Sequence, residues 1–265
     1  MTSNDSPLLP RSILVVEDVT YHEIARDPAT VQLLEDVEAM VIPFAAEPEL
    51  NTQAVLATRT LLREAGQLAR GALLVRNPYQ ERAFEYADTA IESFASEKYL
   101  ALANVARLLG ATRVTYGEVR VEATDSTWIA GAKAKVAIGK LDNETRRRVE
   151  KKVERAIKGE HVFAGGAPDT DAALEYIRRR RLVTDQRLNL LVEMRSGHNL
   201  IHRFQMITNG LKESNTNFRA ALELANAGPA KAIGAGGSFS HTASRLSSIE
   251  ITIDIEFGEA AATTP

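Results

Sequence analysis

The segment from Ile249 to Phe257 alternates apolar and polar residues without interruption, and this pattern constrains the fold more than any other feature. Its apolar residues are Ile249, Ile251, Ile253, Ile255 and Phe257, and its polar residues are Glu250, Thr252, Asp254 and Glu256. Successive side chains of a strand point to opposite faces of a sheet. The pattern therefore predicts a C-terminal strand over residues 248–257 with one buried face and one acidic face in water.

A second amphipathic segment complements this strand. Residues 130–138 alternate small or apolar residues with Lys133 and Lys135, so their polar face carries positive charge. Opposite charges that face each other across paired strands contribute about 0.2–1 kcal/mol per pair. We therefore expect residues 130–138 to pair with the C-terminal strand.

A hairpin is predicted over residues 112–139, with its turn near Asp125. In the first arm, Val114 and Tyr116 share one parity, whereas the apolar residues from Val119 onward share the other. Gly117 lies where the phase changes, which indicates a β-bulge.

Most of the remaining chain has the three- and four-residue apolar spacing of amphipathic helices. Helices are predicted over Val31–Val41, Thr52–Ala69, Tyr79–Leu109, Asn143–Lys158, Asp169–Met194 and His198–Ala227. For the last of these, a break near Asn209-Gly210 is an alternative. Short apolar runs predict two further strands, at residues 13–16 and 72–75. Residues 228–248 are rich in Gly, Ser and Ala and are interpreted as a connector.

These elements predict an α+β fold. The hairpin 112–139 and the C-terminal strand 248–257 form a small antiparallel sheet that packs against several long amphipathic helices. Residues 13–110 are expected to form an α/β N-terminal part and residues 111–258 an α+β C-terminal part, packed together as one unit. Residues 1–12 and 259–265 are interpreted as disordered tails.

Composition excludes several classes of function. The chain has 265 residues and no cysteine, which excludes disulfides, thiolate catalysis and cysteine-bound zinc. Its start lacks a cationic segment followed by an apolar run, and no stretch approaches the roughly 20 apolar residues of a membrane helix. We therefore expect a soluble, cytoplasmic protein, and no cofactor is indicated.

The net charge of −3 conceals an asymmetry along the chain. Residues 1–110 contain 9 Lys and Arg against 16 Asp and Glu, whereas the remaining residues contain 23 against 19. An acidic first part and a basic second part can bind each other, within one chain or between copies.

Two basic clusters are candidates for binding nucleic acid or a protein partner. The first contains Arg146, Arg147, Arg148, Lys151 and Lys152, and the second contains Arg178, Arg179, Arg180 and Arg181. Four consecutive arginines point all round a helix, so they cannot all serve one flat surface. Tyr176 is the only nearby aromatic residue suited to stacking on bases.

Two further motifs are candidate binding sites. His198 and His202 are four residues apart, which places both imidazoles on one face of a helix, as a metal pair requires. No third ligand and no zinc-protease glutamate accompany them. The Gly-rich segment Gly234–Ser240 lacks the preceding strand and following helix of a phosphate-binding loop, so we interpret it as connector.

The run Ile13–Val19 resembles the opening of a response-regulator receiver domain, in which an acidic pair after the first strand helps to hold magnesium. The resemblance implies that role for Glu17 and Asp18. That family also requires a phosphoacceptor aspartate after a later strand, and residues 55–74 contain none. The two acids are therefore interpreted as strand-end residues.

No catalytic constellation emerges from these motifs, although an enzyme with a metal at the histidine pair remains an alternative. The sequence predicts a non-enzymatic binding or self-assembly protein whose partner is itself or another protein. One alternative is an effector that forms pores in membranes, since the amphipathic strands reach the length of about 9–11 residues that a membrane barrel strand needs. Another is a nucleic-acid-binding protein that uses the basic helices.

Overall fold

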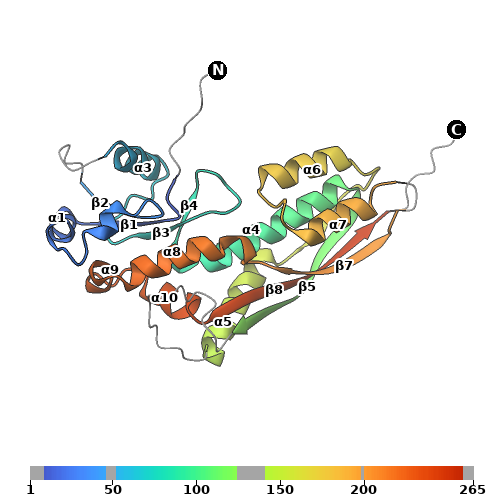
Figure 1. The fold of residues 1–265 in the computed structure, drawn as a ribbon. Coiled ribbons are helices and arrows are strands. Elements are labelled where there is room, and N and C mark those ends of the chain that lie inside the picture. The colour runs from blue at the N-terminus through green and yellow to red at the C-terminus, as the bar shows by residue number, and fades with distance from the viewer. Residues whose placement is uncertain (1–8, 46–51, 124–140, 198–199, 259–265) are drawn as a thin grey trace, which may run out of the picture.

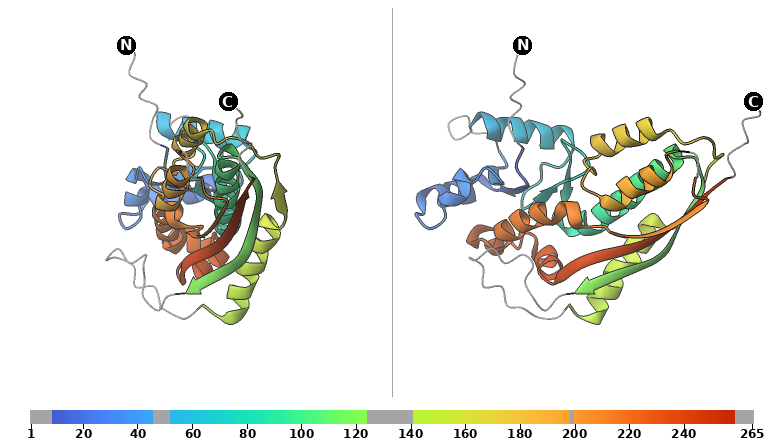
Figure 2. Two further views of the ribbon diagram at one scale, coloured as in Figure 1. Left: turned by 90° about the vertical axis from the view of Figure 1, so that its right-hand side faces the viewer. Right: turned by 45° about the vertical axis from the view of Figure 1, so that its right-hand side comes forward.

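The computed structural model describes residues 9–45, 52–123, 141–197 and 200–258, and it confirms the α+β class. Two four-stranded sheets, called sheet A and sheet B, lie toward opposite ends of an elongated molecule (Figure 1). The long helix α4 (Ala87–Leu108) runs from one sheet toward the other. Figure 2 shows the same arrangement from two further sides.

Sheet A has the strand order β2-β1-β3-β4, in which β1 and β2 are parallel and the other pairs antiparallel. Its strands are β1 (Ser12–Val16), β2 (Ala39–Pro43), β3 (Leu73–Arg76) and β4 (Phe84–Tyr86). Every residue of β1 is buried. Leu14 and Val16 belong to one apolar cluster, and Ile13 and Val15 belong to another, so β1 is covered on both faces.

Helices pack against both faces of sheet A. On one face, α3 (Gln53–Glu64) buries Val55 and Leu62 against Ile13 and Val15. On the other face lie α1 (Asp18–Arg26) and α8 (Asn215–Asn226), and α8 contacts β1, β2 and β3. Figure 1 shows α3 and α8 on opposite sides of the sheet.

The helix predicted over Val31–Val41 is wrong beyond its first turn. Helix α2 (Gln32–Glu35) ends before Asp36, whose side chain accepts hydrogen bonds from the amides of Glu38 and Ala39 at 2.7 and 3.1 Å. This local turn redirects the chain, and β2 then buries its apolar residues in sheet A.

Helix α4 occupies the centre of the molecule. It contacts β3 and β4 of sheet A and β5 and β8 of sheet B, and it is buried on most of its circumference. It begins at Ala87, later than the predicted Tyr79, because residues 84–86 form β4. Gly110 follows the helix at φ +83°, and a Cβ there would lie 2.2 Å from the carbonyl oxygen of Gly166. This turn therefore requires glycine.

Sheet B has the order β6-β5-β8-β7, and all its pairs are antiparallel. Its strands are β5 (Ala111–Ala123), β6 (Glu160–Val162), β7 (Arg203–Asn209) and β8 (Leu246–Phe257). The apolar residues of β8 are buried and alternate with half-buried polar ones, as predicted. The register of β5 against β8 shifts between Tyr116 and Val119, which confirms the bulge at Gly117.

The neighbours of β8 among the described residues are β5 and β7. The predicted pairing of residues 130–138 with this strand concerns residues outside the described ranges. The second arm of the predicted hairpin falls in 124–140 and lies outside the described residues. Helix α5 (Asn143–Ile157) lies beside β5, and its Glu150 accepts a hydrogen bond from the amide of Val121 at 3.1 Å. The helix thus satisfies part of the edge of β5.

Two predictions near the C-terminal end of the chain, a helix over His198–Ala227 and a connector over 228–248, are corrected. Strand β7 replaces the start of the helix predicted over His198–Ala227, because Phe204, Met206 and Thr208 face the interior at the two-residue period of a strand. After β7 in the chain, the 3₁₀ helix η2 (Lys212–Ser214) leads into α8. The connector 228–248 contains α9 (Gly228–Ala232) and α10 (Gly237–Ala243).

The helix predicted over Asp169–Met194 is divided into α6 (Thr170–Arg179) and α7 (Gln186–Met194). Arg181 adopts φ +58°, which ends the first helix. The carboxylate of Asp185 then accepts from the amides of Arg187 and Leu188 and begins the second.

No helix within the described ranges is long and apolar enough to cross a membrane.

Candidate functional site

The first basic cluster lies on α5, which begins at a well-defined cap. The amide and hydroxyl of Thr145 both donate to the carboxylate of Asp142 at 2.8 Å, and the amide hydrogen bond lowers the pKa of Asp142. Val149, Val153 and Ile157 form the buried face of the helix. Its exposed face therefore consists largely of charged residues.

The cations of α5 differ in their partners. Lys152 pairs with Glu92 of α4 at 2.9 Å, and Arg148 lies 3.9 Å from Glu144. Arg147, Lys151 and Arg155 are exposed, and no ion pair or hydrogen bond engages their side chains among the described residues.

An apolar hollow adjoins this exposed face. It lies between α4 and α5 and has a volume of about 380 Å³. Helix α4 lines it with Thr89, Glu92, Ser93, Ser96, Glu97 and Leu100, and α5 lines it with Lys152 and Ala156. Leu100 is 47% exposed, although most residues of α4 are buried. We call this region the α4–α5 surface, which consists of Leu100, Arg147, Lys151, Lys152, Arg155 and Ala156. Sequence analysis found the cations but not the hollow, because its walls come from separate helices.

The second basic cluster does not join the first. Arg178 pairs with Glu175 at 3.4 Å, and Arg181 pairs with Glu81 at 3.1 Å. The guanidinium groups of Arg179 and Arg180 lie 5.3 and 5.7 Å from the ring centre of Tyr176. Helices α5 and α6 contact different sides of α4 (Figure 1), so the two clusters form separate surfaces.

The opposite charge gathers where α1, α2 and β2 meet. We call this region the acidic end, and its exposed carboxylates are Glu17, Glu23, Asp27, Glu35, Asp36 and Glu38. Glu17 pairs with Arg70 and Glu38 pairs with Arg11, whereas no ion pair engages the others within the described part of the chain. Val19 and Val37, 68% and 76% exposed, lie among them.

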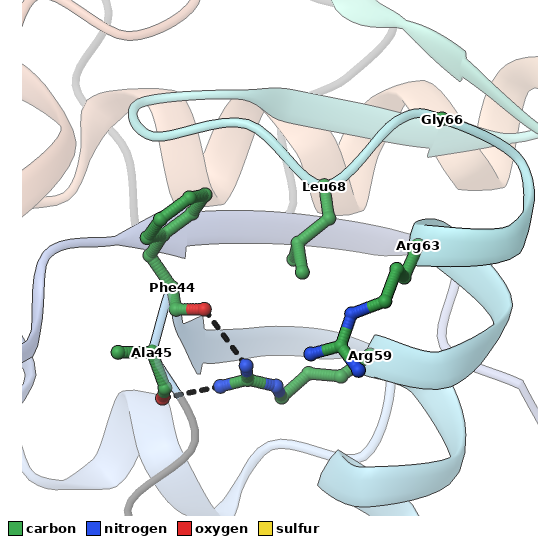
Figure 3. A pocket seen from close by; sticks show the side chains of 6 residues that line it. All are labelled: Phe44, Ala45, Arg59, Arg63, Gly66 and Leu68. Carbon is green, nitrogen blue, oxygen red and sulfur yellow. Dashed lines mark hydrogen bonds between the residues drawn. The ribbon is translucent and has the colours of Figure 1, made fainter.

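A pocket lies at the carboxyl end of β2. It has a volume of about 380 Å³ and is lined by Phe44, Ala45, Arg59, Arg63, Gly66 and Leu68 (Figure 3). The guanidinium of Arg59 is buried and donates to the carbonyls of Pro43 and Phe44 at 2.8 Å, and also to that of Ala45. Sequence analysis missed this pocket because its lining comes from β2, α3 and the segment after α3.

A buried charged cluster joins the two halves of the molecule. Lys98 of α4 is 1% exposed and contacts the carboxylates of Asp185 and Glu213 at 2.9 and 2.8 Å. The Tyr79 hydroxyl lies 3.3 Å from Glu213 and 3.3 Å from the Gly210 carbonyl. Burial, and then the charge of Glu213, raise the pKa of Tyr79 well above its usual value. Because every group in this cluster is enclosed and paired, its role is structural.

The remaining sequence candidates are placed as follows. His202 is exposed and its carbonyl accepts from the amide of Phe257, whereas His198 lies outside the described residues. Among the described side chains, no group of three or more His, Asp or Glu could hold a metal ion. Asp18 accepts a hydrogen bond from the amide of Ala45 at 3.0 Å, so it positions the segment after β2.

Within the Gly-rich segment Gly234–Ser240, Gly236 adopts φ +68° at the start of α10, and a Cβ there would lie 2.4 Å from Leu73 Cδ2. That glycine therefore permits close packing of α10 on sheet A.

Comparisons with protein-family models, with curated proteins and with solved structures each found no match, so functional inference rests on the residues and contacts described above.

Proposed function

We propose that this chain is a non-enzymatic self-assembly protein, in which the α4–α5 surface of one copy binds the acidic end of the next. The observation that carries this proposal is the set of exposed cations Arg147, Lys151 and Arg155 on α5, which have no ion pair or hydrogen bond among the described residues. The same helix contributes Lys152 and Ala156 to the lining of the hollow.

Charge complementarity supports a second copy as the partner. Glu23 and Glu35 at the acidic end are exposed and have no ion pair within the described residues. Contact between these carboxylates and the cations of α5 supplies each group with an opposite charge. Such complementarity steers association and fixes the orientation of the partners.

Apolar complementarity points the same way. Val19 and Val37 project from the acidic end, and the hollow beside Leu100 and Ala156 is of a size to receive apolar side chains. Burial of apolar surface contributes about 25 cal/mol per Å², so these contacts supply affinity where the rim charges supply orientation.

The two surfaces lie on separate parts of the same molecule, as Figure 1 shows for α1 and α5. A contact between them in different copies is therefore heterologous, and it builds a ring if the rotation closes or a filament if it does not.

The first test is molar mass by light scattering after size exclusion, at low and high salt. Assembly that dissociates as salt rises is expected, because salt screens exposed charges. A monomer at every protein and salt concentration contradicts the proposal.

Charge exchange then tests the surfaces themselves. Lys151→Glu with Arg155→Glu, and Glu23→Lys with Glu35→Lys, should each give monomers, whereas an equimolar mixture of the two variants should assemble again. Arg178→Glu, on the separate surface of α6, is the matched control and should assemble like the unmodified chain.

Two results identify a different partner. Salt-sensitive gel shifts with DNA or RNA that are lost in the α5 variant, from a chain that stays monomeric, indicate a nucleic-acid-binding protein. Dye release from anionic liposomes by the monomer indicates a membrane effector.

A further inference from the structure

The pocket at the carboxyl end of β2 has walls that the chain itself holds in place. Arg59 is 3% exposed, and its guanidinium donates hydrogen bonds to the carbonyl oxygens of three consecutive residues, Pro43, Phe44 and Ala45. Asp18 accepts the amide of Ala45, so the same segment is fixed from a second side. A preformed wall lowers the entropy that a ligand must overcome.

Arg63 supplies a cation that this framework does not use. It lies one turn beyond Arg59 on α3 and is exposed, and its side chain makes no ion pair or hydrogen bond among the described residues. Burial, and then the charge of Arg63, lower the pKa of Arg59, and the charge of Asp18 acts in the opposite direction. An anion placed between the two guanidinium groups and solvent offsets the charge of Arg63.

The rest of the pocket is apolar and in part aromatic. Phe44 and Leu68 face the pocket beside Arg63 (Figure 3). The guanidinium of Arg70 lies 4.8 Å from the ring centre of Phe44, which steadies the ring. The volume of about 380 Å³ falls in the range of roughly 300–1,000 Å³ that small-molecule sites occupy.

The position of the pocket is also typical of ligand sites. It lies just beyond the carboxyl end of β2, which runs parallel to β1. In sheets with parallel strands connected by helices, ligands bind beyond the carboxyl ends of the strands.

We propose that this pocket binds a small organic anion, whose carboxylate or phosphate pairs with Arg63 while its flat apolar body packs on Phe44 and Leu68. The site is separate from the α4–α5 surface and does not depend on self-assembly.

The test is isothermal titration of the full chain with phenyl phosphate and with benzoate, which separates the two anion chemistries. Inorganic phosphate reports the charge alone, and benzyl alcohol reports the ring alone. Saturable binding of phenyl phosphate or benzoate is expected, with weaker binding of the other two probes.

Variants then assign the contact. Arg63→Gln should weaken binding of the organic anion about tenfold, the effect of one charge-assisted hydrogen bond. Phe44→Leu should weaken phenyl phosphate or benzoate but leave inorganic phosphate unchanged. Arg187→Gln removes an exposed arginine on α7 and is the control, with no change expected. Equal affinity in Arg63→Gln, or no saturable binding of any probe, overturns the proposal.

Discussion

Sheets A and B differ in how their strands are buried. Sheet A is covered on both faces by helices, and all five residues of β1 are buried. Within the part of the chain that the structure describes, the residues of β8 in sheet B alternate between buried apolar and half-buried polar side chains. Sheet A also carries a pocket beyond the carboxyl end of β2, whereas β8 in sheet B carries its polar residues on one face.

The largest expected loss of folding stability comes from introducing a carboxylate into β1 or into the buried face of β8. Leu14→Asp and Val15→Asp should each destabilise the protein by more than about 4 kcal/mol, because both faces of β1 exclude water. Ile253→Asp should be equally severe, but Thr252→Asp should change the free energy of unfolding by less than about 1 kcal/mol. Urea unfolding measures the free energy of unfolding of all four variants.

A mild Val15→Asp would show that sheet A has a solvated face and would remove the contrast. Where the aspartate variants fail to fold, Leu14→Ala and Val15→Ala serve instead, and both should still destabilise.

The next largest effect is expected at the junction between the sheets. Lys98→Met leaves Asp185 and Glu213 buried without their cation and should cost about 3–5 kcal/mol. Lys152→Met removes the half-exposed pair with Glu92 and should cost less than about 1 kcal/mol. Equal effects in urea unfolding would mean that the Lys98 cluster is hydrated.

The smallest expected effect concerns Tyr99, on the side of α4 that faces sheet B. Burial raises the pKa of Tyr99 from 10.0 to about 12, so folding favours the neutral phenol. Its contribution to stability is present below about pH 10 and is lost as the pH rises toward 12.

Tyr99→Phe should therefore flatten the alkaline decline in unfolding free energy. It should also add about 1 kcal/mol near neutral pH, because the buried Tyr99 hydroxyl has no hydrogen-bond partner among the described residues. Unfolding by urea at a series of pH values checks both statements. An unchanged alkaline slope would contradict the assignment to Tyr99.

The same contrast between the sheets explains what the sequence could predict. The alternation of β8 and the bulge at Gly117 were readable because one face of sheet B meets water. The sequence predicts helix where β2 lies, because a strand buried on both faces has no alternating pattern. Strand β7 does alternate, but its short pattern lies among residues with helical spacing.

A candidate site could be predicted from the sequence only where a single element carries its residues. The exposed cations of α5 were predictable because a single helix presents them. The pocket could not be predicted, because Arg63 lies on α3 whereas Phe44 follows β2. No local sequence pattern indicates that these two residues line the same pocket. The Lys98 cluster likewise depends on contacts between residues up to 134 positions apart.

The central position of β8 also bears on how quickly the chain can fold. Hydrogen bonds between β5 and β8 connect residues separated by 125 to 144 positions. Closing such long loops must precede the gain from pairing, and folding rates fall as the mean sequence separation of contacts rises. Sheet B is therefore expected to form late and slowly, and the apolar residues of β5 stay exposed to aggregation until β8 arrives.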